Sequence, residues 1–355
     1  MNTLKLQKLR TEMKQRNVEA VLVTSPYNLH YITEFTGTAG LAIVTPERAV
    51  FITDFRYTEQ ANEQITEFEV VQAEKNLMDQ AVQTVKAMDI QTLAFEQDYM
   101  TYSTATQYKE KMDAELEPIS NLIEKIRMVK TPEEVSILKA AAKIADDAFE
   151  HICGFIRPGL KEVEVSNELE FFMRKQGATS SSFDIIVASG LRSALPHGVA
   201  TDKVIEKGDM ITLDFGALYN GYISDITRTV AVGEPSAQMK EIYDIVLKAQ
   251  ELGVEKIGPG MSGIEADALA RDFIKSKGYG EAFGHSTGHG IGLEVHESPG
   301  LSFRSETVLE PGMAVTVEPG IYLPGVGGVR IEDDILITES GNERLTNSTK
   351  ELRIL

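Results

Sequence analysis

The sequence has 355 residues, which is long enough for two domains that each bury a hydrophobic core. Hydrophobic residues make up 42% and charged residues 25%, as in soluble globular proteins, and no apolar run approaches the length of a signal peptide or a membrane span. The net charge of −19 argues against a nucleic-acid partner, because phosphate binding requires a face rich in lysine and arginine. We therefore expect a soluble, cytoplasmic protein that binds neither nucleic acid nor membranes.

Residues 1–124 alternate short β-like runs with helical patterns, which predicts an α/β domain. The predicted strands are 20–23, 41–44, 49–52 and 92–95. A second domain, residues 125–355, is expected because a strong helix start follows. Thr131 is placed as the N-cap, Pro132 occupies the first helical position, and Glu134 completes a capping box. Beyond this start, apolar residues recur in steps of three and four, which predicts one long amphipathic helix.

The second domain contains an internal repeat. The segments that align without gaps are 157–177 with 258–278, and 207–216 with 311–320. In the first pair, each copy has a Pro-Gly turn, an amphipathic helix and a glycine at which the helix ends. In the second pair, Asp214 aligns with Glu318. The repeat predicts two related halves, each a helix followed by β-strands, with one acidic residue at the same point of each half.

Asp214 and Asp225 lie on two predicted strands that a tight turn joins. The dipeptide Asn220-Gly221 is preferred in two-residue type I′ turns, and this turn places Asp214 opposite Thr227. The two aspartates then become diagonal neighbours on one face, with Cβ atoms roughly 5.5 to 8 Å apart. Two carboxylates on otherwise apolar strands need a proton, a basic partner or a cation. The alternative is an exposed hairpin with two solvated aspartates.

Glu318 and Glu332 form a second acidic pair. Glu318 ends a predicted strand, and Glu332 follows a Gly/Pro-rich excursion within the next predicted strand, 329–337. Alternation along that strand places Glu332 on the same face as Arg330 and Asp334. A solvated strand face is again the alternative.

Four histidines of the second domain lie beside or close to glycine or proline: His197, His285, His289 and His296. Three of them fall within twelve residues, after the two aspartates and before the two glutamates. Four carboxylates with one or two imidazoles favour Mn²⁺, Co²⁺ or Fe²⁺ over a thiolate-type Zn²⁺ centre. Because four carboxylates carry too much negative charge for one divalent ion, we expect two ions about 3.5 to 4 Å apart, with a bridging hydroxide. The pattern therefore predicts metal-assisted hydrolysis.

The order of these motifs resembles the pita-bread metallopeptidases, which include methionine aminopeptidase, aminopeptidase P and prolidase. Asp214 and Asp225 are followed by GHGIG, VEPG and RIED. The segments SPYNLHYITEFTG and TDFRYTEQA are similar to the N-terminal domain of the proline-specific members and of creatinase. The resemblance covers nearly the whole chain. It implies an α/β (α+β) protein with a creatinase-like domain and a C-terminal pita-bread domain that has an internal pseudo-twofold repeat.

The resemblance also implies a set of metal ligands: Asp214, Asp225, His289, Glu318 and Glu332. Asp225 and Glu332 would bridge the two ions. Glu318 would accept a proton beside the bridging hydroxide, while the metal ions polarise the scissile carbonyl.

Four further residues are assigned to the substrate by the same resemblance. His296 would contact the substrate and stabilise the tetrahedral oxyanion. His197 and His285 would line the pocket, and His197 would help to hold the substrate. Arg330 would pair with a ligand carboxylate or with substrate, although a simple charge partner of the acidic cluster is the plainer interpretation.

The implied substrates are small peptides with proline in the second position, and family members commonly form homodimers. Prolidase, which cleaves dipeptides, and aminopeptidase P stay open as alternatives, with a slight preference for dipeptides because the N-terminal domain is short. A methionine aminopeptidase lacks that domain. A creatinase-like amidinohydrolase does not use the metal pair, and a non-catalytic peptide-binding relative would have lost ligands.

Overall fold

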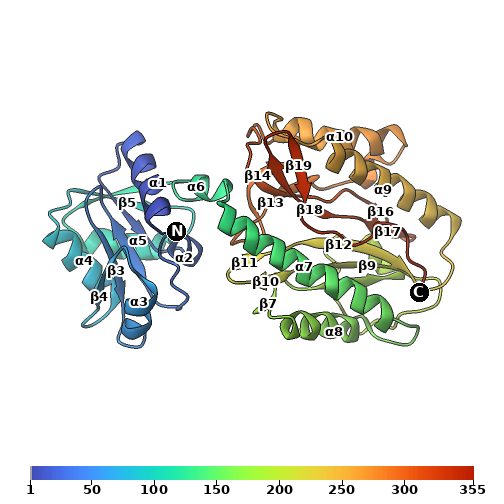
Figure 1. Cartoon of the computed structure of the whole chain (residues 1–355), viewed down its shortest axis with the longest axis horizontal. Coiled ribbons are helices and arrows are strands. Elements are labelled where there is room, and N and C mark those ends of the chain that lie inside the picture. Colours follow the sequence, from blue (N-terminus) through green and yellow to red (C-terminus); the bar gives the residue numbers. More distant parts are fainter. Residues whose placement is uncertain (1) are drawn as a thin grey trace. The chain divides into compact units, whose positions relative to one another are not determined.

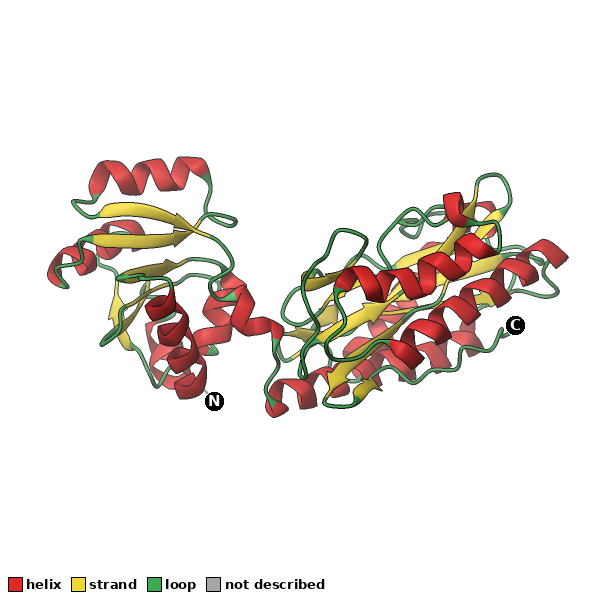
Figure 2. Ribbon diagram, turned by 90° about the horizontal axis from the view of Figure 1, so that it is seen from above, coloured by secondary structure: helices red, strands yellow, loops and turns green. Residues whose placement is uncertain are grey.

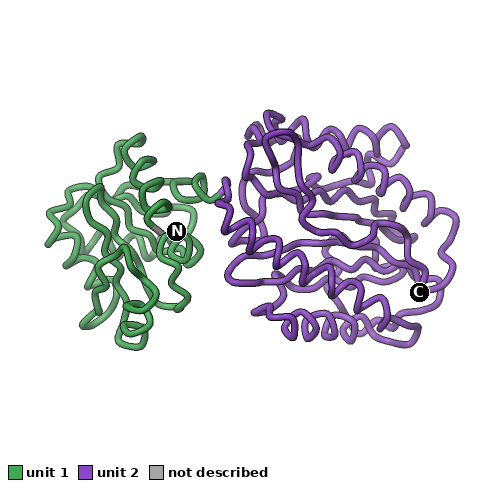
Figure 3. Tube along the Cα trace, in the orientation of Figure 1, with its two compact units in different colours: residues 1–127 green, residues 128–355 purple. Residues whose placement is uncertain are grey.

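The computed structural model describes residues 2–355, which form two compact units divided after Arg127 (Figure 3). Unit 1 ends at Arg127 and unit 2 comprises Met128–Leu355. Each unit has its own hydrophobic core. Among the described residues, no helix combines the length and the apolar character that a membrane span requires.

Unit 1 is a six-stranded mixed sheet with helices, and its strand order is β4-β3-β2-β1-β5-β6. The strands are β1 (Ala20–Val23), β2 (Leu41–Val44), β3 (Ala49–Thr53), β4 (Glu69–Gln72), β5 (Thr92–Glu96) and β6 (Glu115–Ile119). The helices are α1 (Asn2–Gln15), α2 (Pro26–Thr33), α3 (Thr58–Gln64), α4 (Leu77–Ala87), α5 (Tyr102–Lys111) and α6 (Glu124–Met128), the last residue of which already belongs to unit 2. The four predicted strands are confirmed. The two that sequence patterns did not reveal, β4 and β6, are the edge strands, and they are only partly buried.

Unit 2 places four helices outside several small sheets (Figure 1, Figure 2). The helices are α7 (Pro132–Phe155), α8 (Glu162–Lys175), α9 (Ala237–Lys256) and α10 (Gly263–Ser276), with 3-10 turns η1 (Gly190–Ala194) and η2 (Gly280–Ala282). α7 packs against α8, and α9 packs against α10. The capping box predicted at the start of α7 is confirmed, because Thr131 and Glu134 each bond the other's backbone N–H.

The strands of unit 2 form a three-stranded sheet β12-β9-β8, a five-stranded sheet β14-β13-β15-β18-β19, and two small sheets, β11-β10-β7 and β16-β17. Their bounds are β7 (Ser180–Ser181), β8 (Ile186–Ser189), β9 (Met210–Phe215), β10 (Ala217–Tyr219), β11 (Tyr222–Ile223), β12 (Ile226–Ala231), β13 (Gly288–Gly290), β14 (Glu297–Leu301), β15 (Ala314–Val317), β16 (Gly320–Leu323), β17 (Gly327–Arg330), β18 (Asp333–Thr338) and β19 (Gly341–Arg344). Buried residues of α7 and α8 form one core with β8, β9 and β12. Residues of α9 and α10 form another with β16 and β17.

The internal repeat is visible in the structure. The corresponding helices α8 and α10 begin at Glu162 and Gly263, and both follow a glycine in the left-handed region, Gly159 with φ 95° and Gly260 with φ 86°. Each helix leads to strands that carry acidic residues toward the middle of unit 2. The repeat therefore supplies two similar scaffolds for one site.

The register of the aspartate hairpin is as predicted. Asn220 and Gly221 have φ angles of 48° and 83°, the positive values that a type I′ turn requires. Asp214 pairs with Thr227 in the ladder between β9 and β12. The turn therefore determines which residues face Asp214.

The single strand predicted over residues 329–337 is wrong, because the chain changes sheets within it. Arg330 ends β17, which pairs with β16, and Asp333 begins β18, which pairs with β15. Glu332 lies between these strands, and its backbone N–H donates to the carbonyl of Thr227 at 3.1 Å. The break places Glu332 beside the aspartate hairpin.

Two glycines provide a matched test of backbone conformation. A Cβ added at Gly154 or Gly159 would meet no atom within 4 Å, but Gly154 lies in α7 whereas Gly159 has φ 95°. We expect Gly154→Ala to stabilise the protein by up to about 1 kcal/mol. Gly159→Ala should destabilise it by about 1 to 2 kcal/mol, because L side chains clash in the left-handed region. Urea unfolding measures both, and equal effects would contradict this account.

Candidate metal centre

Unit 2 contains a cavity of about 570 Å³ that all nine predicted site residues line. They are Asp214, Asp225, Glu318, Glu332, His197, His285, His289, His296 and Arg330. The other lining residues are largely apolar: Phe183, Asp184, Ile186, Pro196, Val199, Ser286 and Val295. The structure thus brings together residues that span more than a hundred positions of sequence.

The four carboxylates reach the cavity from strands or from their ends. Asp214 lies within β9, and Asp225 immediately precedes β12. Glu318 immediately follows β15, and Glu332 lies between β17 and β18. Asp214, Asp225 and Glu332 are buried, whereas Glu318 is half-buried. Rigid strands therefore hold all four acids close to one another.

His289 completes the acidic cluster. Its Nε2 lies 3.4 Å from Glu318 Oε1 and 3.9 Å from Asp225 Oδ2. Ligand atoms of Asp225, His289 and Glu332 all lie within 4.8 Å of one another. The glycines on both sides let β13 approach its neighbours closely, since a Cβ on Gly288 would collide with the backbone carbonyl of Thr316. Glycine is thus the residue that allows the histidine to reach the acids.

Burial and mutual repulsion dominate the electrostatics of the cluster. Burial raises the pKa of Asp225, and the charges of Glu332 and Asp214 raise it further. Burial, followed by the charges of Glu318 and Asp214, likewise raises the pKa of Glu332. Burial raises the pKa of Glu318 to about 8, although Arg330 acts in the opposite direction. The cluster therefore resists carrying its full negative charge without a cation.

A cation fits the donor set. The Oδ1 atoms of Asp214 and Asp225 are buried and have no hydrogen-bond partner anywhere within residues 2–355. Burial lowers the pKa of His289 to about 4, so its imidazole is neutral and has a nitrogen lone pair to offer. Carboxylate oxygens with one neutral imidazole form a set that suits hard or borderline divalent ions. The residues present therefore fit a metal site.

Arg330 lies inside the acidic cluster. Its Nη2 donates to Asp214 Oδ2 at 2.5 Å, and its Nη1 donates to the hydroxyl of Tyr322 at 2.8 Å and to the carbonyl of Pro196 at 3.1 Å. Its Nε donates to the hydroxyl of Thr227 at 3.1 Å. All three nitrogens of the guanidinium are thus engaged within the protein, and the structure places Arg330 as a partner of Asp214.

The remaining histidines differ in how they are held. His285 Nδ1 donates to the carbonyl of Ser286, so Nε2 accepts from the hydroxyl of Tyr322 at 2.8 Å. Burial, with the charge of Arg330, lowers the pKa of His285 to about 4. His296 is exposed, and its ring lies 4.3 Å from that of His289 between centroids. His197 is exposed on the loop after η1. These two rings are the accessible ones.

Sequence reasoning missed two residues that organise the site. Tyr322 connects Arg330 to His285, and the hydroxyl of Thr227 donates to Glu332 Oε2 at 2.6 Å. Thr227 was detectable, because the predicted hairpin register places it opposite Asp214. Tyr322 carried no such signal, since a tyrosine in a strand is normally read as a core residue.

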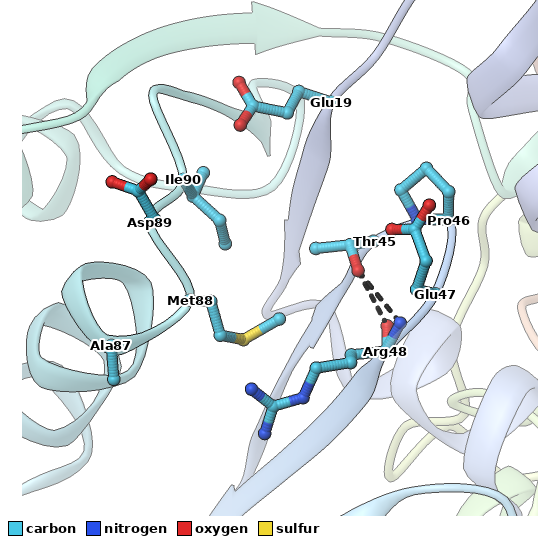
Figure 4. Close-up of a pocket in the computed structure, with 9 residues that line it drawn as sticks. All are labelled: Glu19, Thr45, Pro46, Glu47, Arg48, Ala87, Met88, Asp89 and Ile90. Atoms are coloured by element: carbon cyan, nitrogen blue, oxygen red, sulfur yellow. Dashed lines mark hydrogen bonds between the residues drawn. The ribbon is translucent and has the colours of Figure 1, made fainter.

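Another cavity, of about 390 Å³, lies in unit 1 (Figure 4). The turn between β2 and β3 forms one wall, and a hydrogen bond from the Arg48 backbone N–H to the Thr45 hydroxyl closes that turn. Its lining has three carboxylates, Glu19, Glu47 and Asp89, but no histidine or cysteine. Arg48 pairs with Glu69, and Glu19 accepts from the backbone N–H groups of Gln91 and Thr92, so these charges already have ordinary partners within the protein.

Two family models match the chain. Residues 136–339 match metallopeptidase family M24, and residues 5–129 match the creatinase/prolidase N-terminal domain. The structure resembles that of a Xaa-Pro dipeptidase from Bacillus anthracis, with a TM-score of 0.98 and 63% identity over 100% of both chains. It also resembles an X-Pro aminopeptidase from Thermotoga maritima, with a TM-score of 0.91 and 41% identity over 97% of this chain and 100% of the other.

Sequence similarity extends over the same length. A Xaa-Pro dipeptidase of Pyrococcus furiosus is 44% identical to this chain, and the match covers 98% of this chain and 99% of the relative. This match therefore includes both the N-terminal domain and the C-terminal domain. The chain belongs to metallopeptidase family M24 and carries the creatinase/prolidase N-terminal domain.

Proposed function

We propose that this protein is a Xaa-Pro dipeptidase that hydrolyses the bond before proline in dipeptides. The observation that carries the proposal is the buried cluster of four carboxylates and one neutral histidine, with unpaired oxygens on Asp214 and Asp225. The substrate class is supported by the named activities of relatives that match over nearly their full length.

We further propose two metal ions, held by Asp214, Asp225, His289, Glu318 and Glu332, with Asp225 and Glu332 shared between them. The acids outnumber the one arginine in contact with them, so a single divalent ion would leave the cluster negative. Mn²⁺ suits the oxygen-rich set best, Co²⁺ and Fe²⁺ are the alternatives, and Zn²⁺ fits less well. When bound, such ions supply an activated water and polarise the substrate carbonyl.

The protein side chains do the remaining work in this proposal. Glu318 accepts the proton that the attacking water loses, which its position beside His289 permits. His296 donates a hydrogen bond to the oxyanion, and His197 and His285 hold the substrate. Arg330 keeps Asp214 in place through the 2.5 Å contact. The tertiary amide of Xaa-Pro has no N–H, so the apolar lining around it leaves no donor unpaired.

A second candidate activity is that of an Xaa-Pro aminopeptidase on longer peptides. The likeness to the enzyme from Thermotoga maritima favours it, because that chain also matches over its whole length. Assembly as a homodimer, location in the cytoplasm and a domain boundary after residue 124 stay predictions.

Hydrolysis rates on a Xaa-Pro dipeptide and a Xaa-Pro-Xaa tripeptide test the substrate. With added Mn²⁺ or Co²⁺ we expect the dipeptide to be cleaved faster, and excess chelator to abolish cleavage because the carboxylates alone provide no Lewis acid. Faster cleavage of the tripeptide would instead support the aminopeptidase. If neither peptide is cleaved while metal is bound, the proline-specific assignment is wrong, and methionyl peptides are the next substrates to test.

Thermal unfolding with and without metal tests the ion site independently of activity. In chelator at pH 8, we expect Asp225→Asn to melt at a higher temperature than the wild type. The raised pKa of Asp225 means that folding at this pH must either bind a proton or bury a charge there, and an amide requires neither. In excess Mn²⁺ the order should reverse, since ligand at a hundred times its Kd stabilises the wild type by about 2.7 kcal/mol. Asp272→Asn, on the exposed side of α10, is the control, and it should change the melting temperature neither in chelator nor in Mn²⁺. If Asp225→Asn still melts at a higher temperature than the wild type in excess Mn²⁺, Asp225 is not a metal ligand.

A further inference from the structure

Glu162, in the first turn of α8, is a carboxylate with no exposed surface. Its Oε1 accepts from the backbone N–H and the hydroxyl of Ser189, both at 2.8 Å. Its Oε2 accepts from the backbone N–H of Thr201 at 3.1 Å, from the hydroxyl of Thr201 at 2.8 Å, and from the guanidinium of Arg192. One side chain thus receives five hydrogen bonds.

These partners bracket the loop that presents His197. The loop runs from Ser189, the last residue of β8, to Thr201. Glu162 therefore binds both ends of the loop. Arg192 joins the two parts of the loop, because its Nη2 donates to the carbonyl of Val199 at 2.9 Å. Both His197 and Val199 line the cavity. The carboxylate therefore contacts both ends of the loop without lining the cavity.

The large apolar side chains of this loop contribute little packing to its conformation. The side chains of Leu191, Leu195 and Val199 are 63%, 52% and 46% exposed. The imidazole of His197 makes no hydrogen bond with any residue from 2 to 355. The position of the ring therefore depends on the backbone of the loop. Polar contacts hold that backbone: those of Glu162 at its ends, the bond from Arg330 to the carbonyl of Pro196, and the bond from the Gly328 backbone N–H to the Ser193 hydroxyl.

The chemistry of the contacts requires a carboxylate. All five partners are donors, and an ionised carboxylate has two oxygens that only accept. Burial would raise the pKa of Glu162, but the hydrogen bonds from Arg192 and Ser189 lower it below the usual value. A glutamine of nearly the same shape would present an amide NH₂ to two or more of the donors, leaving them unpaired.

We infer that Glu162 is a positioning residue for catalysis, which acts by placing His197 against the substrate. The inference rests on the proposed function, because it takes His197 as a substrate contact. Glu162 itself lines no part of the cavity and touches no predicted metal ligand among its hydrogen-bond partners. Its effect passes through the loop.

A double-mutant cycle with Glu162→Gln and His197→Ala tests this coupling on a Xaa-Pro dipeptide. We expect each single variant to lower kcat/KM between about tenfold and a hundredfold, as misplacement of a substrate contact does. The kcat/KM of the double variant should equal that of His197→Ala alone, because Glu162 can no longer affect the position of an imidazole that is absent. Metal content should equal that of the wild type. Additive losses would show that Glu162 acts independently of His197 and would overturn the inference.

A second readout does not depend on activity. In protein labelled with ¹³C-histidine, the His197 ring signal is assigned by its loss in His197→Ala, and Glu162→Gln should shift or broaden it. Glu170→Gln is the matched control, because Glu170 also lies on α8 and accepts from the Ser181 backbone N–H and Arg174, away from the loop. If the wild type cleaves no Xaa-Pro peptide, the proposed function fails, yet this shift still supports the placement of His197. An unchanged signal in Glu162→Gln would overturn it.

Discussion

The concentration of negative charge inside unit 2 is the constraint on which the rest of the site depends. Four carboxylates converge on one cavity, and a single guanidinium, that of Arg330, pairs with one of them at 2.5 Å. Asp333 shows how the fold treats an acid that is not part of this cluster. Burial would raise the pKa of Asp333, but the charges of Arg228 and Lys350 outweigh burial and lower this pKa below its usual value. The pKa of its neighbour Glu332 is raised instead, because burial and the charges of Glu318 and Asp214 outweigh the opposing effect of Arg330. Two adjacent residues thus differ: Asp333 has basic partners, whereas Glu332 faces the cavity in which we propose that the cations bind.

The architecture explains how the acids stay together despite their repulsion. Each half of the repeat contributes a helix and strands, and each half delivers two carboxylates. The sheet change between β17 and β18 places Glu332 against Thr227, whose hydroxyl donates to it. Buried carboxylates on the helices support the histidines in the same manner: Glu162 of α8 binds the ends of the His197 loop, and Asp267 of α10 accepts from Thr287 beside His289. The acids thus lie on strands or at their ends, whereas hydrogen bonds to buried carboxylates hold the segments that carry the histidines.

Local rules explain which features were predictable from sequence. The type I′ turn at Asn220-Gly221 determined the register of Asp214, because turn chemistry acts within a few residues. The sheet change at Glu332 escaped prediction, since it depends on which distant strands pair with β17 and β18. Tyr322 was missed because its partners, Arg330 and His285, come from different segments. Glu162 looked like an ordinary acid in a helical first turn, and only the fold shows that it binds a loop about thirty residues away. The edge strands β4 and β6 of unit 1 are only partly buried, so they need no continuous apolar run, and the sequence pattern did not reveal them.

Anomalous diffraction from crystals of the protein loaded with Mn²⁺, recorded at the manganese absorption edge, would reveal whether the five proposed ligands hold two divalent ions. We expect two peaks in the cavity, both between the side chains of Asp225 and Glu332, with one also bounded by His289. A single peak, or manganese bound elsewhere with the cavity left without any, would contradict the two-metal site.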